Sequence, residues 1–172
     1  MDPYATHQEA TVVCALHSGV QWPSSPILEL GCGNYSTPLL AAITKTQARK
    51  LVVMASSDAW LGQFEYLQGE QIELKHINSE SWPRVTLKSG WGMVLVDNEQ
   101  RVVDRLRIVK RLATKSHVVV LHDADSLLDA EGAFHRLCRW YQFAHLEVRQ
   151  RPATVVLSNS LDPSAWFVHE RT

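Results

Sequence analysis

Short apolar runs alternate along this chain with longer segments in which apolar residues recur every three or four positions. Continuous runs of four to six apolar residues have the length of strands that are buried on both faces, and the longer segments have the period of an amphipathic helix. The pattern predicts strands at 27–30, 51–55, 72–77, 92–96 and 117–121, and helices at 5–20, 37–47, 58–67, 102–113 and 130–143.

Local signals refine several of these elements. Pro38 falls in the first turn of its helix, where a missing N–H group costs nothing, and Asp58 suits a helix N-terminus. Two further apolar runs, 146–148 and 154–157, lie close together in the sequence on either side of a predicted tight turn. They predict a terminal pair of antiparallel strands.

Strands that alternate with helices predict an α/β fold, with a mostly parallel sheet between two layers of helices. We expect a single domain over 1–172, with an N-terminal helical segment at 1–22 and a core at 26–158. Ligands of such folds bind beyond the carboxyl ends of the strands, where the strand order reverses. The segments to examine are therefore 31–37, 55–58, 77–82, 97–101 and 122–126.

The composition adds limits to this interpretation. The 172 residues are 45% hydrophobic and 20% charged, with a net charge of -1, which is unlike a disordered chain and argues against a nucleic-acid partner. The three cysteines, Cys14, Cys32 and Cys138, are far apart, which argues against a disulfide framework or a structural zinc site and favours the cytoplasm. No secretory signal or stretch of about 18 apolar residues is visible, so no membrane partner is expected.

The strongest functional signal is the segment Glu29-Leu30-Gly31-Cys32-Gly33-Asn34-Tyr35-Ser36-Thr37, at a strand-to-helix turn. Its two glycines allow a tight turn and let a ligand approach bare backbone, next to the free N–H groups of a helix N-terminus. No Gly-Lys-Ser/Thr follows, so the segment is not a P-loop. Ser36 stands where a dinucleotide-binding loop would have its third glycine.

This segment resembles the first motif of the class I S-adenosylmethionine-dependent methyltransferases, E/D-x-G-x-G, through Glu29, Gly31 and Gly33. The segments 94–97 and 119–123 resemble the fourth and fifth strands of that family, and the resemblance covers roughly Pro26 to Leu157. It implies a Rossmann-like three-layer sandwich with a seven-stranded, mostly parallel sheet and a terminal antiparallel strand.

The resemblance also implies the cofactor S-adenosylmethionine and a set of site residues. The implied cofactor-binding residues are Glu29, Gly31, Cys32, Gly33, Asn34, Ser36, Ser56, Ser57, Asp58, Asn78 and Asp97. The implied catalytic residues are Asp97, His122 and Asp123, with His122 as the candidate base because histidine titrates near neutral pH. No metal is predicted, because the Asp-Asn pair that metal-dependent catechol-type members carry after the fifth strand is absent.

The sequence departs from the family at the end of the second strand. Related sequences place there an acid that holds both ribose hydroxyls, in a pattern S-x-E-x-D-x-x-W that aligns Ser56 with the Glu and Asp58 with the Asp, and matches Trp60 to the Trp with one residue fewer between. A hydroxyl in place of the carboxylate should weaken cofactor binding by about 1–3 kcal/mol.

Structural roles compete with several of these functional ones. Gly31 and Gly33 could form a turn without a ligand, and Asp97 could cap the next helix. The segment 122–125 could be solvated, bind a divalent cation or supply a base. The two tryptophans that flank 83–90 could belong to the core or line an adenine pocket.

Other residues are interpreted more simply. We expect Cys32 to be a small packing residue rather than a nucleophile, and Cys14 and Cys138 to fill the core. The basic residues between 101 and 111 predict a solvated helix face, with an acidic partner as the alternative.

The leading hypothesis is therefore methyl transfer from S-adenosylmethionine to an unidentified, small acceptor. A degenerate member that binds a nucleoside weakly or serves as an interaction module is the first alternative, and Ser56 favours it. A dinucleotide-dependent oxidoreductase is disfavoured by the missing third glycine. The sequence does not distinguish oxygen, nitrogen, sulfur or carbon acceptors, and it leaves a homo-oligomer open.

Overall fold

A seven-stranded sheet forms the centre of the computed structural model, which describes residues 7–98, 102–125, 133–147 and 152–167. The strands are β1 (Ile27–Leu30), β2 (Leu51–Ala55), β3 (Ile72–His76), β4 (Trp91–Val96), β5 (Ser116–Leu121), β6 (Phe143–Glu147) and β7 (Thr154–Ser158). They lie in the order β3-β2-β1-β4-β5-β7-β6, and β7 alone runs antiparallel to its neighbours. The predicted α/β fold with a mostly parallel sheet is confirmed.

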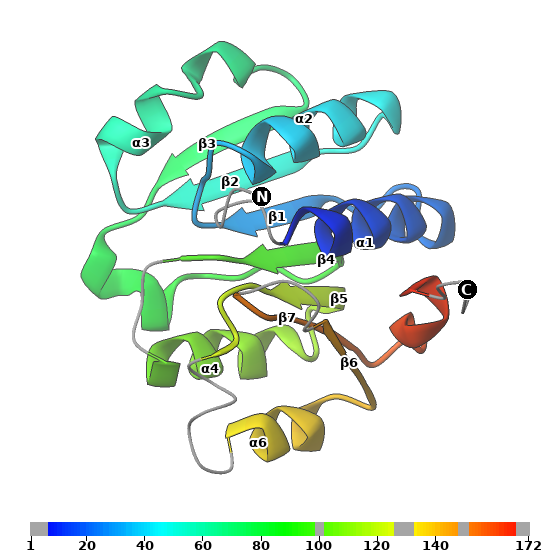
Figure 1. Ribbon diagram of the computed structural model, residues 1–172. Helices are drawn as coiled ribbons and strands as arrows, with labels where there is room; N and C mark the ends of the chain where they lie inside the picture. Colours follow the sequence, from blue (N-terminus) through cyan, green and yellow to red (C-terminus); the bar gives the residue numbers. More distant parts are fainter. Residues whose placement is uncertain (1–6, 99–101, 126–132, 148–151, 168–172) are drawn as a thin grey trace.

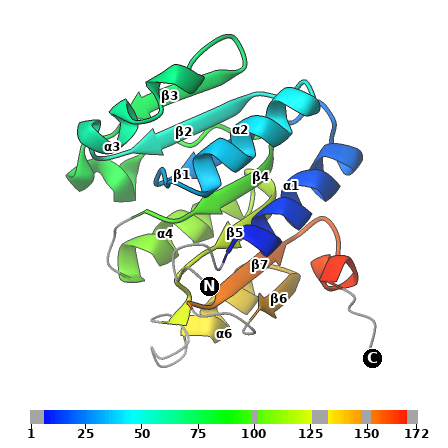
Figure 2. The same ribbon diagram turned by 45° about the horizontal axis from the view of Figure 1, so that its top comes forward.

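Helices cover both faces of this sheet (Figures 1 and 2). The α-helices are α1 (Gln8–Gln21), α2 (Ser36–Thr46), α3 (Asp58–Gly62), α4 (Val102–Leu112) and α6 (Ala133–Trp140). Short 3-10 helices occur at Glu65–Leu67, Ser79–Arg84 and Pro163–Phe167.

Successive side chains of a strand point to opposite faces, so each buried strand contributes to two hydrophobic cores. On one face, Leu28 and Leu30 of β1 pack in a cluster that includes residues of α4 and α6. On the other face, Ile27 packs in a cluster with residues of α1 and α2, among them Cys14. The three-layer sandwich and the core position of Cys14 are therefore as predicted.

The predicted helix at 58–67 is much shorter in the structure. It ends at Gly62 and is followed by a separate 3-10 helix. Asp58 is not its N-cap: the side chain of Ser57 accepts the hydrogen bond from the backbone N–H of Trp60. Trp60 shares helical spacing with Leu61, Phe64 and Leu67, but it is 41% exposed, because the short helix packs against the sheet through Leu61.

Two further predictions about buried and exposed side chains are wrong. Cys138 is exposed on α6 and does not fill the core. Arg105 does not belong to a solvated face: it is buried, while Val103 on the same helix is exposed. The guanidinium of Arg105 finds backbone carbonyl groups as partners, which an amphipathic pattern cannot reveal.

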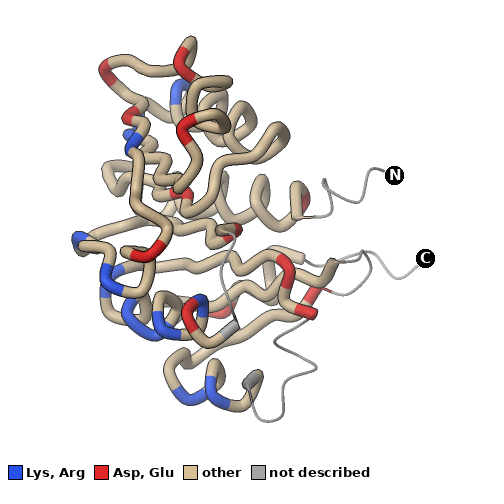
Figure 3. Tube along the Cα trace, turned by 90° about the vertical axis from the view of Figure 1, so that its left-hand side faces the viewer, with Lys and Arg blue, Asp and Glu red and all other residues tan. Residues whose placement is uncertain are grey.

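Most of the lysines and arginines lie over the side of the sheet that α4 and α6 cover, whereas the acidic residues are more dispersed (Figure 3).

Within the described part of the chain, no helix has the length and apolar character needed to cross a lipid bilayer.

Candidate functional site

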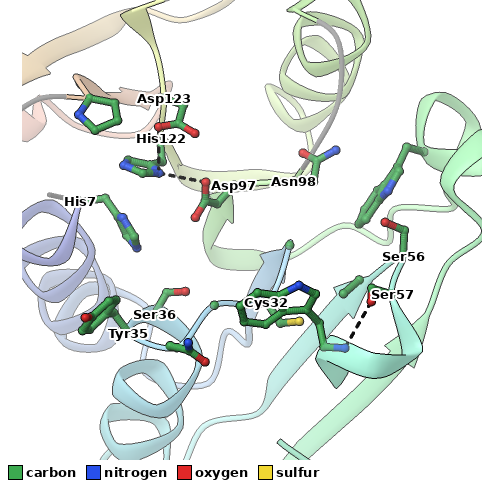
Figure 4. A pocket seen from close by; sticks show the side chains of 17 residues that line it. His7, Cys32, Tyr35, Ser36, Ser56, Ser57, Asp97, Asn98, His122 and Asp123 are labelled. Carbon is green, nitrogen blue, oxygen red and sulfur yellow. Dashed lines mark hydrogen bonds and ion pairs between the residues drawn. The ribbon is translucent and has the colours of Figure 1, made fainter. Parts of the chain in front are cut away.

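A cavity of about 830 Å³ opens where the strand order reverses, at the carboxyl ends of β1, β2, β4 and β5. Its volume lies in the range of small-molecule and cofactor sites. The lining residues are His7, Gly31, Cys32, Gly33, Asn34, Tyr35, Ser36, Ala55, Ser56, Ser57, Trp60, Trp82, Asp97, Asn98, His122, Asp123 and Pro152 (Figure 4). Among the residues predicted for the site, Glu29, Asp58 and Asn78 do not line this cavity.

The glycine loop after β1 forms one wall of the cavity. Gly31 has a φ of 95°, and a Cβ atom there would lie 2.4 Å from the backbone oxygen of Asp97. This glycine is therefore required by the close approach of two strand ends. Gly33 has only the hydroxyl of Ser36 close to its missing Cβ, at 3.1 Å, and its N–H donates to the hydroxyl of Thr37 at 3.0 Å.

Two side chains in and next to this loop have raised pKa values. Glu29 is fully buried beneath it, and burial raises its pKa to about 8, although the hydroxyls of Ser36 and Thr37 act in the opposite direction. Neither of its carboxyl oxygens has a hydrogen-bond partner of normal geometry among the described residues. Burial also raises the pKa of Cys32 to about 11, so its thiol stays protonated, consistent with a packing role.

The end of β2 presents hydroxyl groups where the related pattern has an acid. Ser56 and Ser57 both line the cavity, and the hydroxyl of Ser57 also caps α3. The nearby Asp58 is exposed and pairs with His76, at 3.8 Å between Oδ1 and Nε2, outside the cavity lining. The side chain of Asn78 accepts the backbone N–H of Glu80 and caps a 3-10 helix.

The ends of β4 and β5 bring Asp97 and His122 together. Nδ1 of His122 lies 2.9 Å from Oδ1 of Asp97 and 3.5 Å from Oδ1 of Asp123 (Figure 4). Asp123 has a φ of 51°, a left-handed conformation that aspartate tolerates better than most residues. The predicted catalytic residues Asp97, His122 and Asp123 therefore lie in one cluster on the cavity wall.

His7 joins this cluster from the N-terminal end of α1. Its backbone is the N-cap of the helix, and its carbonyl accepts the N–H of Thr11, but its side chain makes no capping bond. The residue is only 3% exposed, and the centroid of its ring lies 4.1 Å from that of the His122 ring. Burial, together with the nearby His122 ring, lowers the pKa of His7 to about 4, although Asp97 acts in the opposite direction. His7 is therefore neutral at neutral pH.

Arg105 holds the two strand ends in register beneath the cluster. Its guanidinium donates to the backbone carbonyls of Val96 and His122, the residues at the ends of β4 and β5. Burial lowers the pKa of Arg105, while Asp97 and Asp123 favour its charged form. This buried cation therefore fixes the backbone that carries the acidic side chains.

Sequence reasoning found some lining residues and missed others. The segments after the strands included Tyr35, Ala55 and Asn98, but nothing in their types singled them out. His7 and Pro152 lie far from those segments in sequence, and no local signal places them at the site.

Comparison with known proteins rests on structure, because no protein-family model and no curated protein sequence matches the chain. The bifunctional kinase-methyltransferase WbdD aligns with a TM-score of 0.63 at 13% identity, over 90% of this chain and 40% of the WbdD chain. This chain thus spans less than half the length of WbdD. The METTL16 methyltransferase domain aligns with a TM-score of 0.63 at 8% identity, over 90% of this chain and 68% of that one.

A third similar structure was solved with a ligand. NSun6 from Pyrococcus horikoshii, in complex with SFG, aligns with a TM-score of 0.57 at 13% identity, over 88% of this chain and 52% of that one. At these identities the likeness establishes the fold and not the activity. The chain has the class I methyltransferase fold.

Proposed function

We propose that this chain binds S-adenosylmethionine in the cavity beside the glycine loop and transfers its methyl group to a small acceptor. The observation that carries the proposal is the position of the cavity: it lies between β1 and β4, where the strand order reverses, in a class I methyltransferase fold. Ligands of open α/β sheets bind at this point.

The residues of the wall fit most parts of this cofactor. The carboxylate of Asp97 can pair with an ammonium group in a charge-assisted hydrogen bond. The exposed aromatic surface of Trp60 is suited to stack against a purine, whereas Trp82 is fully buried and packs behind the wall. Asn98 is buried at the wall, and neither polar atom of its side chain has a hydrogen-bond partner among the described residues. It therefore offers a donor and an acceptor to a ligand.

The bound cofactor would supply a methyl group already activated by the adjacent sulfonium. The protein then has to position the acceptor in line with that group and, for a protonated acceptor, remove a proton. His122 is the candidate base: when its Nδ1–H donates to Asp97, its Nε2 carries the lone pair that accepts a proton. Asp97 would orient the ring through this hydrogen bond.

One observation favours a second candidate, a degenerate member that binds a nucleoside weakly. The residue aligned with the ribose-binding acid is Ser56, and the hydroxyl of its neighbour Ser57 is already used to cap α3. A single neutral hydroxyl replaces two charge-assisted hydrogen bonds, at a cost of about 1–3 kcal/mol.

Calorimetric titration with S-adenosylmethionine, S-adenosylhomocysteine and NAD tests these functions. The proposal expects binding of the first two ligands and none of NAD. Binding of NAD alone would support the oxidoreductase and overturn the proposal, and no binding of any ligand would favour a non-catalytic module.

A substitution then tests the role of the missing acid. Ser56→Glu should tighten S-adenosylmethionine binding by about 1–3 kcal/mol if the carboxylate is the absent contact. Ser24→Glu is the matched control, because Ser24 is exposed and lies before β1, at the opposite end of that strand from the cavity. Equal affinities of the two variants would contradict the alignment of Ser56 with the acid.

A further inference from the structure

Three side chains from distant parts of the sequence converge at one corner of the cavity. His7 comes from the start of α1, Asp97 from the end of β4 and His122 from the end of β5 (Figure 4). Each offers a ligand atom, and these three atoms lie within 4.8 Å of one another. We propose that His7, Asp97 and His122 bind a divalent transition-metal cation, with Zn²⁺ as the best fit.

The spacing of two of these atoms already suits a metal ion. Ligand nitrogen and oxygen atoms lie about 2.0–2.2 Å from Zn²⁺, so two neighbouring ligands are about 3.0–3.5 Å apart. Nδ1 of His122 and Oδ1 of Asp97 are separated by 2.9 Å. A cation would take the place of the proton they share, and a shift of roughly 1 Å by the His7 ring would complete the set.

His7 supplies the independent observation. Its ring is buried against His122, and neither ring nitrogen has a hydrogen-bond partner among the described residues. A buried imidazole normally satisfies at least one nitrogen, since burying an unpaired polar group costs about 1–3 kcal/mol. The ring of His7 lies beside the pair formed by Asp97 and His122 (Figure 4). A bound cation at this corner would satisfy one of these nitrogens.

The charges and ligand types at this corner select the kind of ion. The corner holds two carboxylates, Asp97 and Asp123, and one buried cation, Arg105. Its net charge is therefore negative when both histidines are neutral. Two imidazoles and one carboxylate favour Zn²⁺, Co²⁺ or Fe²⁺ over the hard ions Mg²⁺ and Ca²⁺, which prefer all-oxygen sites.

Three protein ligands leave at least one coordination position open. Because all three residues line the cavity, that position faces the space proposed for the small molecules. The ion could there hold a water molecule or an oxygen or nitrogen atom of a bound molecule. The metal proposal stands on its own geometry and does not require the methyltransferase proposal to be correct.

Cobalt provides a direct probe, since tetrahedral or five-coordinate Co²⁺ bound by histidine absorbs visible light. Protein stripped with EDTA is titrated with Co²⁺ while the spectrum is recorded, and Zn²⁺ is then added. We expect one Co²⁺ per chain, displacement by Zn²⁺ and no displacement by millimolar Mg²⁺. The absence of a protein-dependent cobalt spectrum, or displacement by Mg²⁺, would overturn the proposal.

Variants separate this site from adventitious binding to other histidines. His7→Ala and Asp97→Asn should each weaken Co²⁺ binding by at least about 10-fold, since each removes or neutralises a direct ligand. His76→Ala is the matched control, because it removes a histidine that also pairs with an aspartate but lies outside the cavity lining. It should leave Co²⁺ affinity unchanged.

Circular dichroism identifies any variant that fails to fold. If either His7→Ala or Asp97→Asn does not fold, the Co²⁺ affinity of the other one tests the proposal. Unchanged Co²⁺ affinity in folded His7→Ala, or an equal loss in His76→Ala, would overturn the assignment. Titration of the EDTA-treated protein with S-adenosylmethionine is scored separately, so failure of the cofactor proposal is distinguishable from failure of the metal proposal.

Discussion

The buried carboxyl group of Glu29 should make the protein less stable as pH rises through the neutral range. Burial raises its pKa from 4.5 to about 8 in the folded chain, so between these values the folded state holds a proton that the unfolded state has released. Stability contributed by this group is then fully present below about pH 4.5 and is lost as pH rises toward 8. A pH of about 7.5 lies roughly three units above the pKa of the unfolded state, so the stability lost is about 4 kcal/mol at about 1.36 kcal/mol per unit.

The substitution Glu29→Gln removes this titration while keeping the shape of the side chain. Its free energy of unfolding at about pH 7.5 should exceed that of the wild type by roughly 3–4 kcal/mol, and at about pH 5 by less than 1 kcal/mol. Urea denaturation of the ligand-free protein at both pH values measures the difference. Glu70→Gln is the control, since Glu70 is exposed.

The reasoning is refuted if the advantage of Glu29→Gln is the same at both pH values, because a packing effect would not depend on pH. It is also refuted if the variant is less stable at the higher pH. That result would mean that the native protein holds a charged carboxylate at this position and compensates it by hydrogen bonds.

Other predictions address the backbone of the site and its aromatic wall. Gly31→Ala should destabilise the fold by about 2–4 kcal/mol in urea denaturation, because the new Cβ overlaps backbone atoms at a residue with positive φ. Gly33→Ala should cost less than about 1 kcal/mol, because its Cβ meets only a hydroxyl. Equal costs would contradict this assignment. Arg105→Met should cost about 2 kcal/mol or more in the same assay, because the buried carbonyls of Val96 and His122 each lose the donor that links the two strand ends. A neutral effect would show that the guanidinium does not hold the strand ends. Trp60→Ala should weaken calorimetric binding of S-adenosylmethionine by about 1–3 kcal/mol with little change in stability, and unchanged affinity would exclude stacking on this ring.

The fold was predictable because each parallel strand is buried on both faces by its own short apolar run. β1 and β2 begin and end where the sequence predicts, and Leu28 and Val53 face opposite cores as strand periodicity requires. The helix after β2 was less predictable. Its apolar spacing continues to Leu67, but the structure breaks it after Gly62, and tertiary packing leaves Trp60 exposed.

Much of the candidate site was predictable for a similar reason. Residues that directly follow parallel strands meet at one edge of the sheet, so Asp97 and His122 could be placed together without a structure. The resemblance to a family fixed the loop at Gly31 but could not tell that Glu29 lies beneath the cavity wall rather than on it. That distinction depends on which face of the sheet the Glu29 side chain occupies at the end of β1.

His7 shows where such reasoning ends. Its place at the site depends on how α1 packs across the sheet, which is a long-range contact between helix and strand residues and leaves no trace in the spacing of apolar positions. The apolar face of α1 determines how the helix packs on the sheet. The N-cap residue therefore lies near the strand ends, whichever amino acid occupies that position. A residue with ordinary capping ability would have bonded its own helix, whereas histidine leaves the helix N–H groups uncapped and extends its ring toward His122. The ring thus gives up a local hydrogen bond for a buried position with none, and a ligand that binds both histidines would recover that loss.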